Sequence, residues 1–487
     1  MKFSESITKS NEYKVSTAES KNKSPSQNGY EMPLVYIWIY TLIHFFNHLL
    51  FGLTQSMVPP AYVDFKFTTN ASLPMIGLNP TFQGVGIFIG SFVTIIFKWV
   101  NRQLCLCFVV VIMSLSTIFF PWATTLWQLW LCSLLYGFGV GSWNGCNNVV
   151  LVEMWKHRSP SMLLFAQFVW GVGTILGPLL VEAYVIGNDV CPGVTQEECH
   201  RQQQQHSNPT TVEPNSRCTE WCLNFDRRPQ LKIPFLIGGC LELLGPLCYF
   251  IMFFVNRYRY VKDESRDDIE DEEKKREERE TRKKIVPKYM ILGCMSVVFS
   301  CGILAENLYN SFAATFFQYQ PVLHVSASKA SIISSTMNGA FSLGRFICMF
   351  VAVYVSPQNM ALVELIITLG GYIFQIFGQN DLILLWISAI IISLGFSSIW
   401  ISCFSFIARY MTLTDMIGGW MIGPCNITYI VLGYFISGFM TTNPSIFLYI
   451  STAGVAISIV AHIVAMISVR HVPKELLLNV DPAQTAH

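Results

Sequence analysis

The stretch KDESRDDIEDEEKKREERETRKK, from Lys262 to Lys284, decides how this chain is divided. Of its 23 residues, 20 are charged, nine of them basic and eleven acidic. Acids and bases recur four positions apart, as in Glu270 and Lys274, a spacing that favours a solvated helix with surface ion pairs. The sequence on either side is mostly apolar. The stretch therefore predicts a soluble linker that separates two apolar halves of similar length.

The composition is that of a membrane protein. Hydrophobic residues make up 52% of the 487 residues and charged residues only 13%, with a mean hydropathy of +0.43. A soluble domain carries about 25% charge. The lipid bilayer is thus an expected partner, whereas a net charge of +1 without a basic patch outside the linker predicts no nucleic acid. The sequence has no nucleophile–base set and no metal cluster, so we expect neither an enzyme nor a bound metal.

Apolar runs of about 20 residues, the length that crosses a bilayer as helix, recur along the chain. They predict an all-α membrane protein with 12 transmembrane helices in two pseudo-symmetric bundles of six. The expected spans are Leu34–Val58, Phe82–Lys98, Leu104–Ala123, Leu126–Leu151, Met162–Val185, Ile233–Val255, Tyr289–Phe312, Ala330–Val355, Ala361–Phe377, Leu382–Ile407, Met416–Met440 and Ile446–Val469.

The basic residues of the short loops predict the orientation, because such residues favour the cytosolic side. They place three segments in the cytosol: an N-terminal tail (1–33), the linker (256–288) and a C-terminal tail (470–487). The N-terminal half (34–255) and the C-terminal half (289–469) lie between these segments. The N-terminal tail lacks the apolar core of a signal peptide, so the first span is the expected targeting signal. The expected location is the plasma membrane.

Two features mark the outer face. Asn70 begins an Asn-Ala-Ser glycosylation acceptor in the first outer loop. The long outer loop 186–232 carries Cys191, Cys199, Cys218 and Cys222, which predict two disulfides with three possible connectivities.

The two halves repeat a short pattern. Gly173 to Pro178 in the fifth span and Gly419 to Pro424 in the eleventh both read GxxxGP. Such repetition is typical of transporters built from duplicated halves. We expect the GxxxGP helices to be close-packed seams along which the halves bend or slide.

The fourth and first spans carry polar faces. Asn144 and Asn148 share one helical face with Gly137 and Gly141, and they either join helices by hydrogen bonds or contact a substrate. Asn47, His48 and Gln55 share a face with His44. Two histidines four apart could bind a metal, but no ligand nearby completes a site, so a water-facing stripe or a proton relay is the expected role.

Glu306 in the seventh span is the candidate for ion coupling, because acids are rare in spans without a role. It would couple an ion or accept hydrogen bonds from substrate hydroxyls, and the alternative is a buried salt bridge to Arg345. Glu242 and Glu364 are weaker candidates because their surroundings are apolar.

Amides and aromatic rings recur in the remaining spans. Together they suit a neutral polyhydroxylated ligand, since amides exchange hydrogen bonds with hydroxyls and tryptophan stacks on a sugar ring. The candidates for substrate binding are Gln167, Asn307, Asn310, Asn338, Trp400 and Asn426, with Trp170 and Tyr429 as support.

The segment YGFGVGSWNGCNNVVLVEMW, Tyr136 to Trp155, resembles the span-four signature of the sodium-dependent glucose transporter branch of the major facilitator superfamily, which is related to fucose–proton symporters. Asn148 and Trp155 match its asparagine and tryptophan, and Ala305-Glu306 matches an alanine–glutamate pair. The resemblance covers Leu34 to Val469. It departs at Asn144, where the signature often has aspartate, and in the first span, where Asn47 and His48 replace a carboxylate.

The resemblance implies the major facilitator fold and hexose transport by alternating access, and it leaves sodium coupling, proton coupling and simple facilitation open. The alternatives are transport of another small organic solute and a non-transporting receptor or sensor on the same fold. We expect a monomer without a cofactor, other than co-transported Na⁺ or H⁺.

Overall fold

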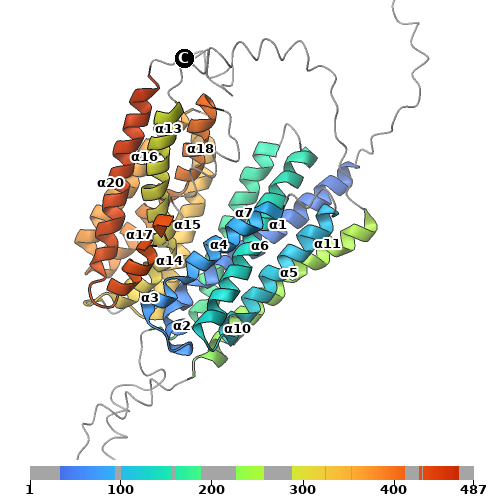
Figure 1. Cartoon of the computed structure of the whole chain (residues 1–487), viewed down its shortest axis with the longest axis horizontal. Coiled ribbons are helices and arrows are strands. Elements are labelled where there is room, and N and C mark those ends of the chain that lie inside the picture. The colour runs from blue at the N-terminus through green and yellow to red at the C-terminus, as the bar shows by residue number, and fades with distance from the viewer. Residues whose placement is uncertain are drawn as a thin grey trace, which may run out of the picture.

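The computed structural model describes residues 33–93, 100–155, 159–187, 226–256, 288–323, 325–352, 354–411, 427–429 and 431–470. These residues form helices joined by short turns, and none of them forms a strand. Figure 1 shows the helices in two groups, one from each half of the chain.

The N-terminal group has the following elements within the described residues. They are α1 (Leu34–Met57), η1 (Pro59–Ala61), α2 (Tyr62–Thr68), α3 (Leu73–Ile76), α4 (Asn79–Ser91), α5 (Arg102–Phe119), η3 (Phe120–Trp122), α6 (Leu126–Trp155), α7 (Ser159–Glu182), α10 (Arg228–Glu242) and α11 (Leu244–Val255).

The C-terminal group begins after the charged linker. It consists of α13 (Lys288–Val298), a π-helical turn η5 (Phe299–Ile303), α14 (Leu304–Tyr319), α15 (Ala327–Val351), α16 (Pro357–Gly378), α17 (Leu382–Phe396), α18 (Ile399–Tyr410), the helix Ile427–Phe439 and α20 (Ser445–Ser468).

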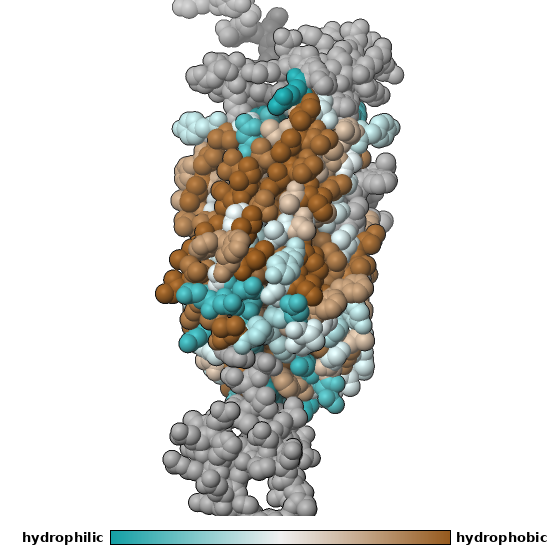
Figure 2. Space-filling view, turned by 90° about the vertical axis from the view of Figure 1, so that its left-hand side faces the viewer, coloured by the Kyte–Doolittle hydropathy of each residue, from teal (hydrophilic) through white to brown (hydrophobic). Residues whose placement is uncertain are grey.

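Each expected span overlaps helical residues, and residues 94–98 of the second span and 416–426 of the eleventh lie outside the described residues. Within the described residues, eight helical segments are long and apolar enough to cross a membrane. The other expected spans coincide with α4, α6, α15 and Ile427–Phe439. Figure 2 shows a broad band of hydrophobic side chains around the middle of the molecule, with hydrophilic residues gathered toward its ends. The protein is therefore a multi-pass integral membrane protein.

Local sequence explains where several helices begin. Asn101 accepts a hydrogen bond from the backbone N–H of Gln103 at 2.9 Å and caps α5. Asp381 caps α17 by accepting from the N–H groups of Ile383 and Leu384. Such caps satisfy backbone donors that the first helical turn leaves open.

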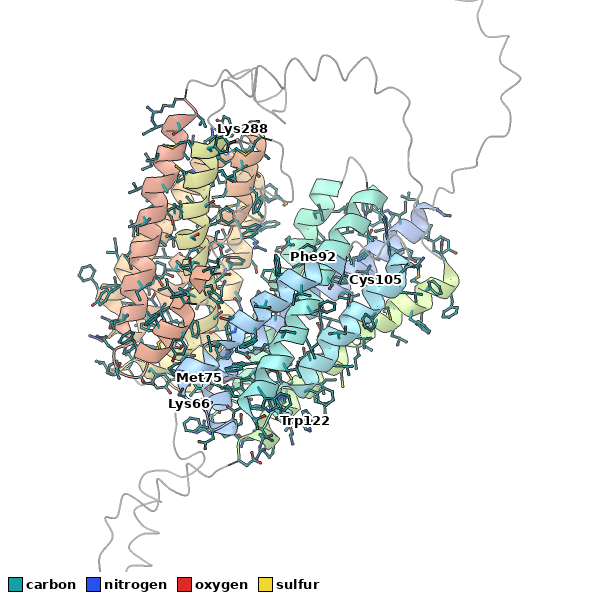
Figure 3. All side chains as sticks on the ribbon, in the orientation of Figure 1. Lys66, Met75, Phe92, Cys105, Trp122 and Lys288 are labelled. Carbon is teal, nitrogen blue, oxygen red and sulfur yellow. The ribbon has the colours of Figure 1, made fainter. Side chains whose placement is uncertain are left out.

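The molecule has two distinct ends. Lys288, the first described residue after the charged linker, lies at what we call the linker end and is labelled there in Figure 3. Lys66 and Met75 mark the opposite end, which we call the loop end. Figure 1 shows the two helix groups diverging toward the linker end and meeting toward the loop end.

The helix groups share apolar cores where they meet. The core of the C-terminal group includes Leu73 of α3, and the core of the N-terminal group includes Ala327 of α15. At the loop end, Lys66 donates a hydrogen bond to the Tyr319 hydroxyl at 3.2 Å, and Ser328 donates to the Glu182 carboxylate. These contacts join the two groups and close the loop end.

Close helix packing within the N-terminal group depends on glycine. A Cβ on Gly173 would lie 2.0 Å from the Leu49 carbonyl oxygen, and one on Gly177 would lie 2.3 Å from that of Leu53. The two glycines of the expected GxxxGP seam therefore pack against α1 of the same half. Thr174 and Ile175 of the same motif accept hydrogen bonds from Asn338 and Ser335 of α15, so the motif also lies on the boundary between the halves. The second motif, Gly419 to Pro424, lies outside the described residues.

Candidate functional site

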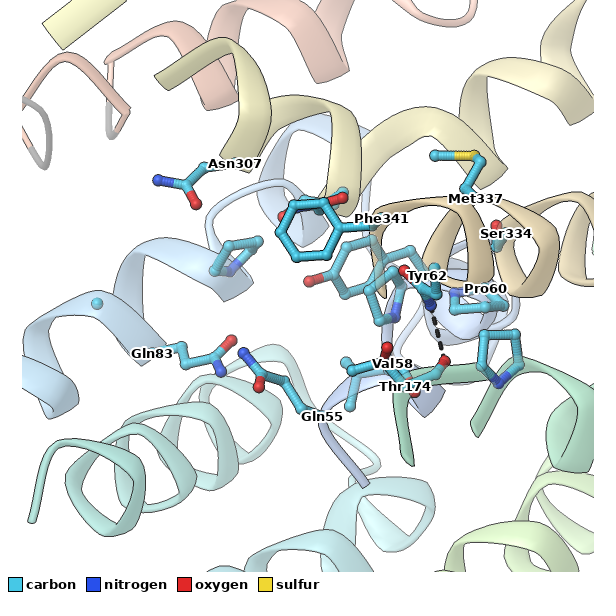
Figure 4. A pocket seen from close by; sticks show the side chains of 18 of the residues that line it. Gln55, Val58, Pro60, Tyr62, Gln83, Thr174, Asn307, Ser334, Met337 and Phe341 are labelled. Atoms are coloured by element: carbon cyan, nitrogen blue, oxygen red, sulfur yellow. Dashed lines mark hydrogen bonds between the residues drawn. The ribbon is translucent and has the colours of Figure 1, made fainter. Parts of the chain in front are cut away.

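A cavity of about 240 Å³ lies between the two helix groups, which we call the central cavity. Figure 4 shows side chains from both groups facing this space. Its lining residues are Gln55, Ser56, Val58, Pro59, Pro60, Tyr62, Pro80, Gln83, Gly84, Ile87, Trp170, Thr174, Pro178, Asn307, Asn310, Ser311, Ser334, Met337, Asn338, Phe341 and Tyr429.

The lining of the central cavity mixes polar and apolar residues and is uncharged among the described residues. It has amides and hydroxyls from α1, α4, α14 and α15, and none of its described lining residues is acidic or basic. Amides both donate and accept hydrogen bonds. Trp170 and Phe341 add aromatic surface. The arrangement can bind a neutral solute that carries several hydroxyl groups.

Hydrogen bonds hold several of these side chains in place. The Trp170 Nε1–H donates to the Gln55 side-chain oxygen at 3.1 Å. The Ser311 and Tyr429 hydroxyls lie 2.7 Å apart. These bonds leave the Gln55 amide nitrogen free to face the cavity, next to Gln83 in Figure 4.

Four of the predicted substrate-binding residues line the central cavity, namely Gln55, Asn307, Asn310 and Asn338. Asn338 also spans the boundary between the halves, because its Nδ2 donates to the Thr174 carbonyl oxygen at 2.8 Å. The supporting residues Trp170 and Tyr429 lie in the same lining. The structure thus brings together residues that are up to 374 positions apart, from Gln55 to Tyr429.

Asn47 and His48 lie elsewhere, buried inside the N-terminal group. Asn47 donates to the Ile43 carbonyl oxygen at 2.8 Å, and His48 Nδ1 contacts the His44 carbonyl oxygen at 2.9 Å. His44 in turn bonds the Tyr249 hydroxyl at 2.6 Å. Contacts with α6 and α11 occupy this face of α1. The part of α1 that carries Asn47 and His48 therefore joins α1 to α6 and α11, and it is not the expected water-facing stripe.

Asn144 and Trp400 also lie outside the central cavity. Asn144 is exposed on α6. Trp400 packs edge-on against Phe299, with ring centroids 5.1 Å apart, in the core of the C-terminal group. Its ring is therefore occupied by packing.

The remaining predicted residues fall in parts of the chain without described side chains. These are Asn148, Asn426, Cys191, Cys199, Cys218 and Cys222. Asn70 is described: it is exposed at the loop end and has a φ of 50°.

A second cavity of about 240 Å³, which we call the linker-side cavity, lies nearer the linker end. Its lining is mostly Phe, Met and other apolar residues, with Gln167, Arg345, Cys348, Ser398 and Ser405 as polar members. Gln167 therefore faces this cavity and not the central one.

Arg345 stands at the boundary between the two cavities. Its guanidinium lies 4.5 Å from the ring of Phe341 and 5.1 Å from that of Trp170, both of which line the central cavity. It donates to the Gln167 side-chain oxygen at 3.1 Å and to the Ser397 carbonyl oxygen at 3.0 Å. Arg345, which lines the linker-side cavity, thus contacts two aromatic rings that line the central cavity.

Glu306 is partly buried one residue before the cavity-lining Asn307. Its Oε2 is enclosed and has no hydrogen-bond partner in the described part of the chain. The alternative, a salt bridge between Glu306 and Arg345, is not present among the ion pairs of the described residues, and Arg345 instead donates to Gln167 and to the Ser397 carbonyl oxygen.

Glu364 has a polar environment that the sequence did not reveal. It is 4% exposed, and it accepts hydrogen bonds from the Cys348 thiol at 3.3 Å and the Ser402 hydroxyl at 3.2 Å. These donors come from α15 and α18, so the apolar neighbours of Glu364 along α16 gave no sign of them.

Other lining residues could have been recognised. Gln83 is an amide within the expected second span, and its polarity at membrane depth was an available signal. A weaker signal came from Ser311, Ser334 and Thr174, because serine and threonine hydroxyls in a helix can donate to a backbone carbonyl of the preceding turn. Ser334, for example, donates to the Ala330 carbonyl oxygen at 3.0 Å.

Residues 22–187 match the Major Facilitator Superfamily. The chain is 20% identical over 399 residues to Major facilitator superfamily domain-containing protein 4A of Mus musculus, covering 74% of this chain and 78% of that protein. It is also 20% identical over 371 residues to Sodium-dependent glucose transporter 1A of Mus musculus, covering 74% of this chain and 80% of that protein.

Solved structures share the fold. The xylose transporter XylE from E. coli, in a partially occluded inward-open conformation, superposes with a TM-score of 0.60 at 11% identity, covering 92% of this chain and 99% of that one. The nucleoside transporter NupG and the transporter FucP in the outward conformation give TM-scores of 0.57 and 0.53 at 14% identity, each covering 89% of this chain and 99% of theirs. The family match is thus confined to residues 22–187, and the chain shares the fold of these solved transporters.

Proposed function

We propose that this protein transports a neutral polyhydroxylated solute, with a glucose-like hexose as the leading substrate, across a membrane by alternating access. The observation that carries the proposal is the central cavity, which lies between the halves and is lined by amides, hydroxyls and aromatic rings without a charged side chain. In such transporters the substrate site lies between two repeats that rock against each other. The similarity to Sodium-dependent glucose transporter 1A supports the same substrate class.

The conformation supports access from the linker end. The loop end is closed by Lys66–Tyr319 and Glu182–Ser328, while the helix groups diverge toward the linker end. We infer that the linker and both termini lie in the cytosol and that Asn70 lies outside, in a plasma-membrane monomer. The structure then represents an inward-facing state. Transport would be coupled to sodium or protons, with Glu306 in the coupling role.

Uptake into proteoliposomes tests the proposal. Purified protein should take up labelled glucose saturably, and unlabelled xylose or uridine should compete if the site accepts other hydroxylated solutes. Absence of saturable uptake of any hexose, with or without a sodium or pH gradient, would refute hexose transport. Saturable binding of a hexose without flux would favour a receptor or sensor on the same fold.

A pair of asparagine variants links uptake to the central cavity. Asn307→Ala removes an amide that faces the cavity, and losing one such hydrogen bond costs about 1–1.5 kcal/mol, or roughly tenfold in KM. Asn443→Ala removes an exposed asparagine outside both cavities and should leave KM unchanged. Equal KM values for the two variants would place the substrate elsewhere.

A further inference from the structure

The linker-side cavity has an apolar wall built from both halves of the chain. Phe165 and Phe168 come from α7 of the N-terminal half, and Phe346 and Met349 come from α15 of the C-terminal half. The Phe168 and Phe346 rings meet across the boundary, with their centroids 5.5 Å apart. Ile401 of α18 adds to the same apolar surface. A hydrocarbon chain in this cavity therefore contacts both halves at once.

The rim of the cavity is accessible and its volume is small. Phe165 is 48% exposed and Phe346 is 41% exposed, and Ala352 after the end of α15 is also exposed. An apolar molecule thus enters past aromatic rings. An apolar cavity of about 150 Å³ holds one benzene molecule. The linker-side cavity, at about 240 Å³, therefore has room for one short hydrocarbon chain and not for a phospholipid with two long chains.

The charged residue among the described lining of this cavity is Arg345. A guanidinium has five N–H donors. The Nε–H donates to the Ser397 carbonyl oxygen and the Nη1 group donates to the Gln167 side-chain oxygen, so three donors have no acceptor in the described part of the chain. Arg345 also takes part in none of the ion pairs of that part. The cavity thus offers a cation with unused donors inside a membrane span, where charged groups are costly and tend to be functional.

No acidic residue lines the linker-side cavity in the described part of the chain. Glu364 lies next to the lining, because Cys348, which does line the cavity, donates its thiol to one Glu364 carboxyl oxygen at 3.3 Å. The Ser402 hydroxyl donates to the other oxygen at 3.2 Å. The Glu364 carboxyl group is therefore satisfied by its own neighbours. An anion that enters the cavity meets Arg345 without facing an acid in the described lining.

We propose that the linker-side cavity binds a single-chain carboxylate of the medium-chain fatty acid class. Its carboxylate would lie on the Arg345 guanidinium and its chain among Phe168, Phe346 and Met349. Arginine suits a carboxylate because its planar guanidinium can form two parallel charge-assisted hydrogen bonds. The site is separate from that of the neutral solute, since the described linings of the two cavities share no residue.

A bound fatty acid would hold the two halves in the present arrangement. The walls of its site belong to α7 of one half and to α15 and α18 of the other. Movement of the halves against each other at the linker end changes the distance between these walls, and alternating access needs that movement. The ligand therefore acts as an inhibitor that does not compete with the transported solute. This effect rests on the proposed transport function, whereas the binding does not.

Photolabelling locates the ligand. Octanoate with a diazirine at the end of its chain is irradiated with the purified full-length protein in lipid nanodiscs, and mass spectrometry identifies the labelled peptides. Label is expected on α7 and α15 around Phe168 and Met349. Unlabelled octanoate should remove it, and octanol should compete at least tenfold less well because it lacks the charge that meets Arg345. Each methylene added from hexanoate to octanoate should strengthen competition about three- to fourfold. Equal competition by octanol, or label without preference for these helices, overturns the proposal.

A pair of variants tests the guanidinium. Arg345→Gln should weaken competition by octanoate about 10- to 100-fold and leave that by octanol unchanged. Lys329→Gln is the matched control, because Lys329 is an exposed cation on the same helix and lines neither cavity. It should leave both ligands unaffected. Wild-type affinity for octanoate in Arg345→Gln, or an equal loss in Lys329→Gln, overturns the proposal.

A second variant covers the case in which Arg345→Gln does not unfold as a single cooperative transition. Ala352→Trp places a large ring at an exposed lining position, so it fills the cavity from the rim without overpacking the core. This variant should lose the photolabel on α7 and α15. Labelling at the wild-type level in it overturns the proposal.

Uptake measurements keep the two proposals apart. In proteoliposomes, octanoate should lower the maximal rate of hexose uptake with little change in KM, and octanol at the same concentration controls for effects on the bilayer. Absence of hexose uptake in the wild type refutes the hexose proposal, while photolabelling still decides the fatty acid site. Inhibition that raises KM alone places octanoate in the central cavity and overturns the proposal. Uptake that is unaffected by bound octanoate refutes the inhibitory role.

Discussion

Replacing Gly137 by alanine should force α4 and α6 apart. A Cβ on Gly137 would lie 2.0 Å from the carbonyl oxygen of Gln83, and one on Gly141 would lie 2.1 Å from that of Ile87. Both opposing atoms belong to the backbone, so no side-chain rotation can relieve the clash. Real Cβ atoms essentially never come within 3.0 Å of such an atom. The helices must therefore separate by at least 1.0 Å, the difference between 3.0 and 2.0 Å.

The energetic cost follows from the same geometry. Overpacking of this kind costs about 1–3 kcal/mol. For a domain of roughly 200 residues, each kcal/mol lowers Tm by about 2–4 °C, which gives a decrease of about 2–12 °C. Gln83 lines the central cavity from α4, so the same displacement should raise the KM for the solute. Adding Gly141→Ala should cost less than the sum of the single effects, because one helix shift relieves both clashes.

The measurement is thermal unfolding of purified variants in one detergent, followed by KM in proteoliposomes. Gly370→Ala on α16 is the matched control, since a Cβ there would meet nothing within 4 Å. It should leave both Tm and KM unchanged. Equal Tm values for Gly137→Ala and Gly370→Ala would refute the close backbone contact on which the reasoning depends.

Three further predictions concern the loop end. Arg227→Met leaves the buried Asp64 carboxylate without the guanidinium that lies 3.0 Å from it, and should destabilise the protein by about 3–5 kcal/mol. Adding Asp64→Asn should restore part of this stability, and thermal unfolding measures both effects. Lys66→Met removes the hydrogen bond to Tyr319 that joins the two halves. Spin-label distances across the loop end should then shift toward a more open population. Unchanged distances would contradict the role of Lys66 in closing this end. Asn70→Gln should abolish the mass shift that a glycosidase produces in protein from mammalian cells, and a persisting shift would exclude this acceptor.

Sequence reasoning succeeded where a property depends on composition along one helix. Apolar runs identified the spans. The amides of Gln55, Asn307 and Asn338 were recognised as candidate binding residues because polar groups at membrane depth are costly and tend to be functional, and all three line the central cavity. It failed where tertiary packing decides which face of a helix meets which neighbour. Asn47 lies on the same helix as Gln55 but faces α11, where its side-chain oxygen would clash with any Cβ on Gly245.

Three acidic residues of the described helices lie near helix irregularities, namely Glu242, Glu306 and Glu364. Glu242 ends α10 beside the interruption before α11, yet hydroxyls satisfy its carboxyl group inside the bundle. Glu306 follows the π-helical turn Phe299–Ile303, and Glu364 faces the break before α18. π-helical turns are frequent at functional sites because they disrupt the regular hydrogen-bond ladder. Side-chain donors satisfy both oxygens of Glu242 and both oxygens of Glu364, whereas Glu306 keeps an enclosed oxygen without a partner among the described residues, so Glu306 is the acid of the three whose carboxyl group packing leaves unsatisfied.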